Sequence, residues 1–264
     1  MKISDIIHYP VKSLSGNQLK SSEIHERGLK DDRRFMLIDD NNTFVSQRKY
    51  PLLSQIDVGI TEENIVLRDR RTNFVIKQEL QFELKKTEVS IWRTLCTSHR
   101  FLKPDLDQWI SEQIGASLRF VYMDESDHRP INPKYSQSED EIVSFADGYP
   151  ILVTNTASLK DLNDQLRDPI SMEHFRPNLV IEHTKAWDED NWKKLRIGEV
   201  ILRIPKPCAR CKVINIDPIT GEKGSEVLQT LAKIRMPEGG IYFGLNAIVE
   251  KTGKVRLGDK VEIV

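Results

Sequence analysis

Two of the three cysteines in the chain, Cys208 and Cys211, lie three residues apart in the segment PCARC. The segment falls between two β-branched runs, 200–204 and 213–216, which we expect to form strands. Arg210 lies between the cysteines and lysines flank them, and such positive charge lowers the pKa of a thiol and favours the thiolate. Thiolates bind metals or attack electrophiles, so the sequence predicts that this segment is the chemical centre of the protein.

The Cys-x-x-Cys spacing alone leaves three interpretations open. A structural zinc site needs four ligands, usually a second such pair or two spaced histidines, and the one other cysteine is Cys96. A dithiol of the thioredoxin type opens a helix in a βαβ unit, whereas we expect a strand and a turn after Cys211. A free cysteine is also often a small buried residue, and on the pair alone this interpretation is favoured.

Residues that suit a bound anion occur in three other segments. Lys12 and Ser13 follow an expected strand, where an ammonium group, a hydroxyl and loop amides can meet a phosphate. Arg33 and Arg34 precede a short apolar run, so we expect one of them to point inward. Arg176 comes just before an expected buried strand. Each of these residues alone is more often an ordinary surface or structural charge. The chain has neither a Walker motif nor G-x-G-x-x-G, so the common nucleotide-binding motifs are absent.

Strands must position most of these residues. Short alternating or β-branched runs bounded by Gly, Asn, Asp and Pro predict them, and their spacing indicates a barrel or sandwich. The expected strands are residues 3–9, 19–25, 35–38, 55–60, 64–67, 74–76, 82–84, 89–92, 118–122, 149–153, 178–181, 200–204, 212–216, 242–249 and 260–263.

Three helices are expected between these strands. The first covers 103–114, with Asp105 as its N-cap and Gly115 at its end. The second begins at residue 155 or 156, and the third covers 225–234. Residues 123–140 are polar, contain prolines and have no periodicity, which is typical of a long loop or a domain connection and often of a functional one.

Length and composition narrow the class of protein. The 264 residues suffice for two modest domains or one large one. The net charge of -1 gives no support for a nucleic-acid or anionic-membrane partner. No apolar stretch reaches the roughly 18 residues of a membrane helix, and the N-terminus lacks the apolar region of a signal peptide. The odd number of cysteines does not make a disulfide framework, so we expect a reducing cytoplasmic location.

An ordered series of segments resembles one family along nearly the whole chain. The segments are YPVKSLSG, GLKDDRRFML, FRPNLVIE, AWDEDNWKKLRIGEVILR, PCARCKVINIDPITGE and IYFGLNAIV with VRLGDKVEIV. They resemble the MOSC proteins of the mARC and YcbX type, which are molybdenum enzymes: the amidoxime-reducing components and their bacterial relatives. The resemblance implies a mainly β fold with peripheral helices: a MOSC N-terminal β-barrel domain over residues 1–122 and a MOSC domain, which binds the molybdenum cofactor, over 123–264.

The resemblance also implies a role for the cysteine segment. Cys211 matches the molybdenum ligand of the family, and Cys208 does not ligate the metal. A soft thiolate suits a redox-active molybdenum held otherwise by a dithiolene and oxo groups. Ala209 and Arg210 match residues that approach the pterin, and the family usually has serine where this chain has Ala209.

The other residues carried over by the resemblance belong to the cofactor site. Lys12, Ser13 and Arg34 match positions that hold the phosphate and pterin end of the cofactor. Arg176 and Asn178 match further pterin contacts.

Asp147, in FADGYP, matches an acid close to the metal in this family. By itself the Asp-Gly pair is a common turn former. A carboxyl group beside the metal can relay protons if burial or nearby negative charge raises its pKa.

The implied activity is a cytoplasmic, molybdenum-cofactor-dependent reduction of N-hydroxylated compounds: hydroxylamines, amidoximes and N-hydroxylated bases, which suits a detoxifying role. The chain lacks the ferredoxin domain of some bacterial relatives, so we expect a separate flavin or iron–sulfur protein to supply electrons. One alternative is a cofactor-binding or sulfur-carrier protein of molybdenum cofactor metabolism. Another is a non-catalytic interaction protein that keeps the fold and not the metal.

Overall fold

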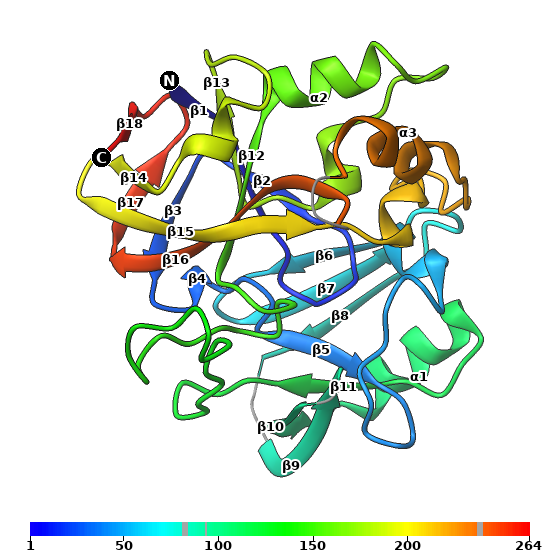
Figure 1. Cartoon of the computed structure of the whole chain (residues 1–264). Coiled ribbons are helices and arrows are strands. Elements are labelled where there is room, and N and C mark those ends of the chain that lie inside the picture. Colours follow the sequence, from blue (N-terminus) through cyan, green and yellow to red (C-terminus); the bar gives the residue numbers. More distant parts are fainter. Residues whose placement is uncertain (81–83, 93, 237–239) are drawn as a thin grey trace.

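The computed structural model describes residues 1–80, 84–92, 94–236 and 240–264 (Figure 1). Most of the expected strand at 82–84 therefore lies outside the described residues. In the described part, strands predominate and three α-helices lie at the periphery, which confirms the mainly β fold class. No helix of this part is long and apolar enough to cross a membrane.

The largest sheet has the strand order β18-β14-β15-β16-β12-β13-β1-β2. Its strands are β1 (Lys2–His8), β2 (Asn17–Leu19), β12 (Ile151–Asn155), β13 (Leu179–Glu182), β14 (Lys194–Ile197), β15 (Val200–Ala209), β16 (Tyr242–Lys251) and β18 (Val261–Ile263). A bridge between Lys2 and Lys260, and a hydrogen bond of 3.0 Å from the Val261 amide to the Met1 carbonyl, join β1 to the other edge of the sheet. The sheet therefore closes into a barrel, and the two chain ends lie close together (Figure 1).

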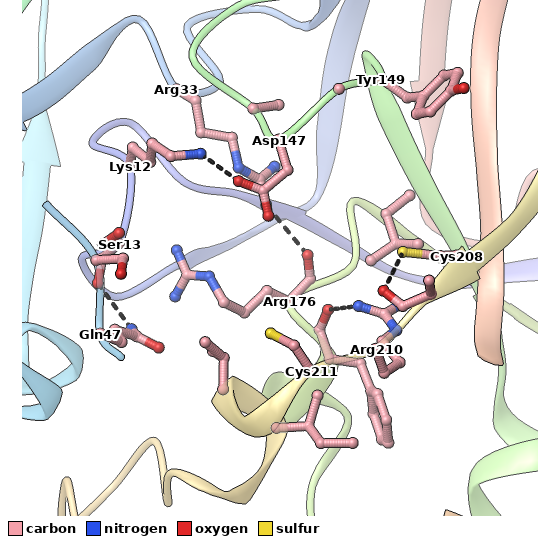
Figure 2. A pocket seen from close by; sticks show the side chains of 18 of the residues that line it. Lys12, Ser13, Arg33, Gln47, Asp147, Tyr149, Arg176, Cys208, Arg210 and Cys211 are labelled. Atoms are coloured by element: carbon pink, nitrogen blue, oxygen red, sulfur yellow. Dashed lines mark hydrogen bonds and ion pairs between the residues drawn. The ribbon is translucent and has the colours of Figure 1, made fainter. Parts of the chain in front are cut away.

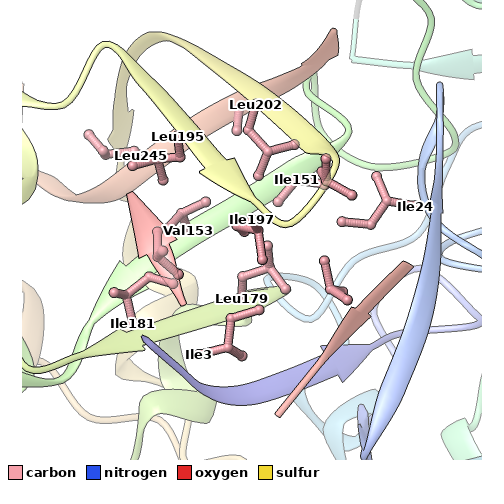
Figure 3. Packing of buried hydrophobic residues seen from close by; sticks show 14 of the residues in the cluster. Ile3, Ile24, Ile151, Val153, Leu179, Ile181, Leu195, Ile197, Leu202 and Leu245 are labelled. Carbon is pink, nitrogen blue, oxygen red and sulfur yellow. The ribbon is translucent and has the colours of Figure 1, made fainter. Parts of the chain in front are cut away.

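Aliphatic side chains fill this barrel, as Figure 3 shows. Alternate residues of β14 and of the first half of β15 are buried, because successive side chains of a strand point to opposite faces. Ile3, Val153, Leu179, Leu195 and Leu202 are each no more than 1% exposed. This core supports the strand ends that carry the candidate site.

Within the described residues, the other strands form three smaller sheets. One comprises β5 (Phe35–Ile38), β9 (Leu84–Ile91), β10 (Thr94–Phe101) and β11 (Arg119–Tyr122). The second comprises β6 (Ile56–Ile60), β7 (Asn64–Asp69) and β8 (Val75–Glu79). The third comprises β3 (Ser21–His25), β4 (Gly28–Leu29) and β17 (Gly253–Arg256).

The helices are α1 (Pro104–Ile114), α2 (Thr156–Asn163) and α3 (Glu226–Ile234), with 3₁₀ turns η1 (Pro51–Gln55), η2 (Met172–Phe175), η3 (Asp188–Asn191) and η4 (Lys212–Asn215). All three expected α-helices are confirmed. The predicted N-cap of α1 is wrong, because Pro104 already occupies the first helical position and Asp105 lies inside the first turn. Gly115 ends the helix in the left-handed conformation, as predicted.

The predicted strand at 212–216 is wrong. The chain forms η4 there, with hydrogen bonds from the Ile214 amide to the Cys211 carbonyl at 3.2 Å and from the Ile216 amide to the Val213 carbonyl at 3.0 Å. Ile214 and Ile216 are still buried, so their spacing imitates the alternation of a strand. Cys211 therefore lies between the end of β15 and the tight turn η4, at the position that precedes the turn.

Hydrogen bonds link the first part of the chain to the last. β1 pairs with β13, and β3 pairs with β17. The region between β11 and β12 is fully described and contains no helix or strand, in agreement with the predicted long loop. The division of the chain into domains at residues 122 and 123 stays a prediction.

A buried carboxyl group joins η3 to the start of α2. Glu189 is 1% exposed, and its Oε2 accepts hydrogen bonds from Asn155 Nδ2 at 2.7 Å and Ser158 Oγ at 2.8 Å. Its Oε1 has no partner within the protein. Burial raises the pKa of Glu189, because desolvation penalises the charged form more than these hydrogen bonds favour it.

We predict that Glu189→Gln increases the free energy of unfolding at pH 7 by about 1 kcal/mol. In the wild type the raised folded-state pKa makes stability fall as the pH rises above the ordinary value of 4.5, and the amide removes that fall. Urea unfolding between pH 4 and 8 measures the effect, with the exposed Glu62→Gln as control. Parallel pH profiles for wild type and Glu189→Gln would contradict this account.

Candidate functional site

A cavity of about 170 Å³ opens between the turn after β1, the loop before β12 and the segment after β15 (Figure 2). All but one of the site residues predicted from the sequence line it. They are Lys12, Ser13, Asp147, Arg176, Asn178, Ala209, Arg210 and Cys211. The fold therefore brings together residues from segments that are up to 199 positions apart in the sequence.

The exception is Arg34. Its guanidinium donates to the Met123 carbonyl and to Glu125, and it lies 5.3 Å from the Tyr122 ring. The adjacent Arg33 lines the cavity instead. Its φ of 50° is left-handed, and this local reversal of the backbone sends the two neighbouring side chains to different places.

Lys12 and Asp147 form an ion pair at the cavity wall. Lys12 Nζ donates to Asp147 Oδ1 at 2.5 Å and to the Phe145 carbonyl at 2.8 Å. Desolvation by the surrounding cavity walls is the largest influence on the pKa of both groups, although the Asp147 carboxylate itself extends into the open cavity. Desolvation lowers the pKa of Lys12 despite the carboxylate beside it. For Asp147 the charges of Lys12, Arg33 and Arg48 and the hydrogen bond from Lys12 outweigh burial and bring the pKa down to about 2.

Asp147 therefore does not meet the condition set for a proton relay. Its side chain is 72% exposed within the open cavity, and the groups nearest to it are cationic rather than anionic. At neutral pH it is an ionised carboxylate that accepts hydrogen bonds. The proton closest to it is held on Lys12 Nζ.

Arg176 supplies a cation that is not fully paired. It follows η2 in the left-handed conformation with a φ of 54°, and its guanidinium lies 4.2 Å from the Tyr9 ring. Burial lowers the pKa of Arg176 to about 10, which leaves it charged at neutral pH. Its Nη2 is buried without a hydrogen-bond partner in the protein. A buried donor without a partner is costly, so this atom is suited to a bound anion.

The two cysteines differ in their surroundings. Cys211 is exposed, and its sulfur points toward the Arg176 side chain in Figure 2. Cys208 is half-buried, and its Sγ lies 3.8 Å from the Ala209 carbonyl. Burial raises the pKa of the Cys208 thiol above 9.0 although Arg210 acts to lower it, so the predicted lowering is wrong for this cysteine.

Arg210 and Asn178 hydrogen-bond to other protein groups around the site. Arg210 donates from Nε and Nη2 to the Phe243 carbonyl, at 2.9 and 2.8 Å, and from Nη1 to the Phe175 carbonyl at 3.1 Å. Asn178 Oδ1 accepts from the Leu152 amide at 3.1 Å and from Arg33 at 3.2 Å. These hydrogen bonds fix the loops that carry Cys211 and Arg176, and the predicted pterin contacts of Arg210 and Asn178 stay predictions.

No cluster of three or more histidine, cysteine, aspartate or glutamate side chains suited to a metal occurs within the described ranges. A structural zinc site needs four such ligands. A single exposed thiol in a cation-lined cavity instead suits a metal that arrives with its other ligands already attached, in an anionic cofactor. The unpartnered Arg176 Nη2 also fits such a group.

Several cavity residues were missed in the sequence. Phe44, Gln47, Arg48 and Trp92 form the wall that faces the turn after β1. Gln47 Nε2 donates to the Ser13 carbonyl at 2.7 Å, and Ser13 Oγ donates to the Val45 carbonyl at 3.1 Å. No motif marks these residues, because contacts across the fold and not local spacing bring them to the site.

Two family models match the chain. The model for the MOSC N-terminal beta barrel domain matches residues 1–117, and the model for the MOSC domain matches residues 140–262. The chain therefore contains a MOSC N-terminal beta barrel domain followed by a MOSC domain.

Individual relatives are similar over nearly the whole chain. Mitochondrial amidoxime reducing component 2 of Rattus norvegicus is 27% identical over 278 residues, covering 98% of this chain and 82% of that protein. Mitochondrial amidoxime-reducing component 1 of Homo sapiens is 29% identical over 280 residues, covering 97% and 81%. The molybdenum cofactor sulfurase of Oryza sativa subsp. japonica is 29% identical over 263 residues, covering 92% of this chain. The chain spans only 32% of the length of that sulfurase.

We predict that Lys12→Met raises the pKa of Asp147 from about 2 toward or above its ordinary value of 3.8, because burial then acts without its main opposing charge. The depressed pKa gives stability that is present above pH 3.8 and is lost as the pH falls toward 2, and the variant loses this dependence. Carboxyl ¹³C NMR titration measures the pKa directly. The exposed Lys30→Met is the control, and an unchanged Asp147 titration in Lys12→Met would contradict the assignment.

Proposed function

We propose that the protein is a molybdenum-cofactor-dependent oxidoreductase that reduces N-hydroxylated compounds. The observation that carries the proposal is the exposed thiol of Cys211 in a cavity where Lys12, Arg33 and Arg176 supply positive charge. The similarity to amidoxime-reducing components over nearly the whole chain supports this substrate class. Hydroxylamines, amidoximes and N-hydroxylated bases share the N–OH group that such an enzyme reduces.

The cofactor is held by two kinds of contact. Cys211 ligates the molybdenum, for which a soft thiolate is suited. Lys12 and the Ser13 turn, together with Arg33 and Arg176, bind the phosphate and pterin end through charge-assisted hydrogen bonds. When bound, the cofactor supplies the two-electron redox chemistry, and the protein supplies orientation and electrostatics.

The reaction consumes two electrons and two protons, and it converts an N–OH group into N–H and water. Asp147 is ionised, so its role is to accept a hydrogen bond from the substrate and to fix its orientation. Lys12 Nζ, 2.5 Å from Asp147, holds the proton nearest to this position. Proton delivery therefore begins on Lys12 Nζ, and Asp147 serves as a hydrogen-bond acceptor rather than as a proton carrier.

A separate flavin or iron–sulfur protein supplies the electrons in this proposal. Small molecules reach the cavity from solvent, and no nucleic-acid polymer is part of the reaction. All three cysteines are free, which supports a reducing, cytoplasmic location.

A role as a carrier of sulfur or cofactor in cofactor metabolism is the second candidate. The similarity to a rice molybdenum cofactor sulfurase favours it, and an exposed cysteine is also the group that a persulfide carrier needs. Turnover separates the two candidates. Benzamidoxime and reduced dye are incubated with protein from a host that makes the cofactor, and amidine formation supports the reductase. Cofactor-loaded protein without any turnover of N-hydroxylated compounds would favour the carrier.

We predict that Cys211→Ala abolishes bound molybdenum and that Cys208→Ala retains most of it. Both cysteines line the cavity, but Cys211 is exposed there, whereas Cys208 is half-buried with a raised thiol pKa. Elemental analysis for molybdenum and zinc after identical purification measures both. Equal molybdenum in Cys211→Ala and wild type would contradict the ligand assignment.

The pair Arg33 and Arg34 provides a matched test of the phosphate and pterin contacts. Arg33→Gln removes a cavity-lining guanidinium, which also pairs with the buried Asp32 at 2.6 Å, and weakens cofactor retention about tenfold. Arg34→Gln removes an adjacent arginine whose guanidinium is engaged by Met123 and Glu125, and it leaves retention close to the wild type. Pterin content after dialysis measures this, and a larger loss in Arg34→Gln would reverse the assignment.

A further inference from the structure

The hairpin that joins β9 to β10 places an aromatic ring on the cavity wall. Ile91 pairs with Thr94, and Trp92 follows Ile91 directly at the tip of the hairpin. Trp92 lines the cavity and remains 41% exposed. It is the largest side chain on the wall that faces the turn after β1.

Trp92 occupies a position that disfavours it. Its φ is 59°, in the left-handed region, and two-residue hairpin turns prefer Asn, Asp or Gly there. An exposed aromatic residue at such a position costs stability without filling a core. The presence of tryptophan at this unfavourable position therefore indicates that its indole ring has a function in the cavity.

Neighbouring side chains hold the indole in place. Arg48 stacks on it with the guanidinium carbon 4.2 Å from the ring, and the Phe44 ring lies 4.7 Å away at an angle of 59°. Arg48 Nε is buried without a partner in the protein. A planar guanidinium and an indole together present flat surfaces on which a conjugated ring can stack.

The Trp92 turn is connected rigidly to the cofactor-binding turn. The Phe44 amide donates to the Ser90 carbonyl at 3.0 Å, and the Ser90 amide donates to the Asn42 carbonyl at 2.9 Å. Ser13 Oγ in turn donates to the Val45 carbonyl at 3.1 Å. The ring is thus fixed relative to the Lys12–Ser13 turn and to Asp147, whose carboxylate Lys12 contacts.

We propose that Trp92, backed by Arg48 and Phe44, is a specificity-determining residue that stacks the aromatic or heteroaromatic ring of an N-hydroxylated substrate. The protein then prefers aryl and heterocyclic substrates to alkyl ones that carry the same N–OH group. This inference rests on the proposed function for the identity of the reactive group. The ring preference itself rests on the geometry of the wall.

Two amidoximes of the same chemistry and different shape test the proposal. Benzamidoxime and acetamidoxime are titrated calorimetrically into wild type, Trp92→Asn and Trp92→Phe without a reductant, so that no turnover occurs. Trp92→Asn raises the Kd for benzamidoxime about tenfold and leaves the Kd for acetamidoxime within about twofold. Trp92→Phe keeps most of the preference, because it retains an aromatic face.

Three further measurements make the result decisive. Asparagine suits the left-handed turn, so the melting temperature of Trp92→Asn stays the same or rises, and weaker binding then does not reflect misfolding. Molybdenum content stays at the wild-type level. Phe74→Leu, which changes an exposed aromatic residue outside the cavity, leaves both Kd values unchanged.

Absence of benzamidoxime binding to wild type, or an equal change for both amidoximes in Trp92→Asn, would overturn the proposal. Failure of the proposed reductase function has a different signature. The ring preference and its loss in Trp92→Asn then persist in calorimetry, while no N-hydroxylated compound is turned over. Turnover with an unchanged ring preference in Trp92→Asn would reject the stacking role alone.

Discussion

Closure of the large sheet by β1 is the constraint on which the site depends. β1 pairs with β13 on one side and meets the start of β18 on the other. The Ile7 amide donates to the Asn178 carbonyl at 2.9 Å, and Asn178 Nδ2 donates to the Ile7 carbonyl at 3.2 Å. These bonds deliver the turn that carries Lys12 beside the segment that carries Arg176. Without this strand, the cavity would lose the wall formed by the turn after β1, and with it Lys12 and its ion pair with Asp147.

The charge balance itself explains why the cavity suits an anion. Lys12, Arg33 and Arg176 converge on a cavity in which Asp147 is the carboxylate that Lys12 contacts. Asp147, together with the buried Asp32 that pairs with Arg33 at 2.6 Å, sets two carboxylates against three cations, and Arg176 Nη2 is buried without a hydrogen-bond partner. Such a site is costly in the free protein and is stabilised when an anionic group binds. Arg210 and Asn178 add rigidity, since carbonyls and amides of the protein occupy their hydrogen-bonding groups, and the Arg210 guanidinium keeps its positive charge.

Much of this architecture could be predicted from the sequence, for identifiable reasons. β5 is a short, continuous apolar run, and α1 has helical periodicity and end signals; both patterns depend only on neighbouring residues. The segment 212–216 misled because two buried isoleucines at a spacing of two fit a strand and a 3₁₀ turn equally well. The choice between Arg33 and Arg34 depended on one left-handed residue, and the Trp92 wall depended on contacts between distant strands. Neither leaves a local pattern.

The most direct test of the cofactor site is anomalous X-ray scattering at the molybdenum K-edge, from crystals of protein made in a host that synthesises the cofactor. The account predicts one strong peak per chain, within bonding distance of Cys211 Sγ and on its cavity side. A peak at Cys208 or elsewhere, or no molybdenum peak from protein made in such a host, would contradict it.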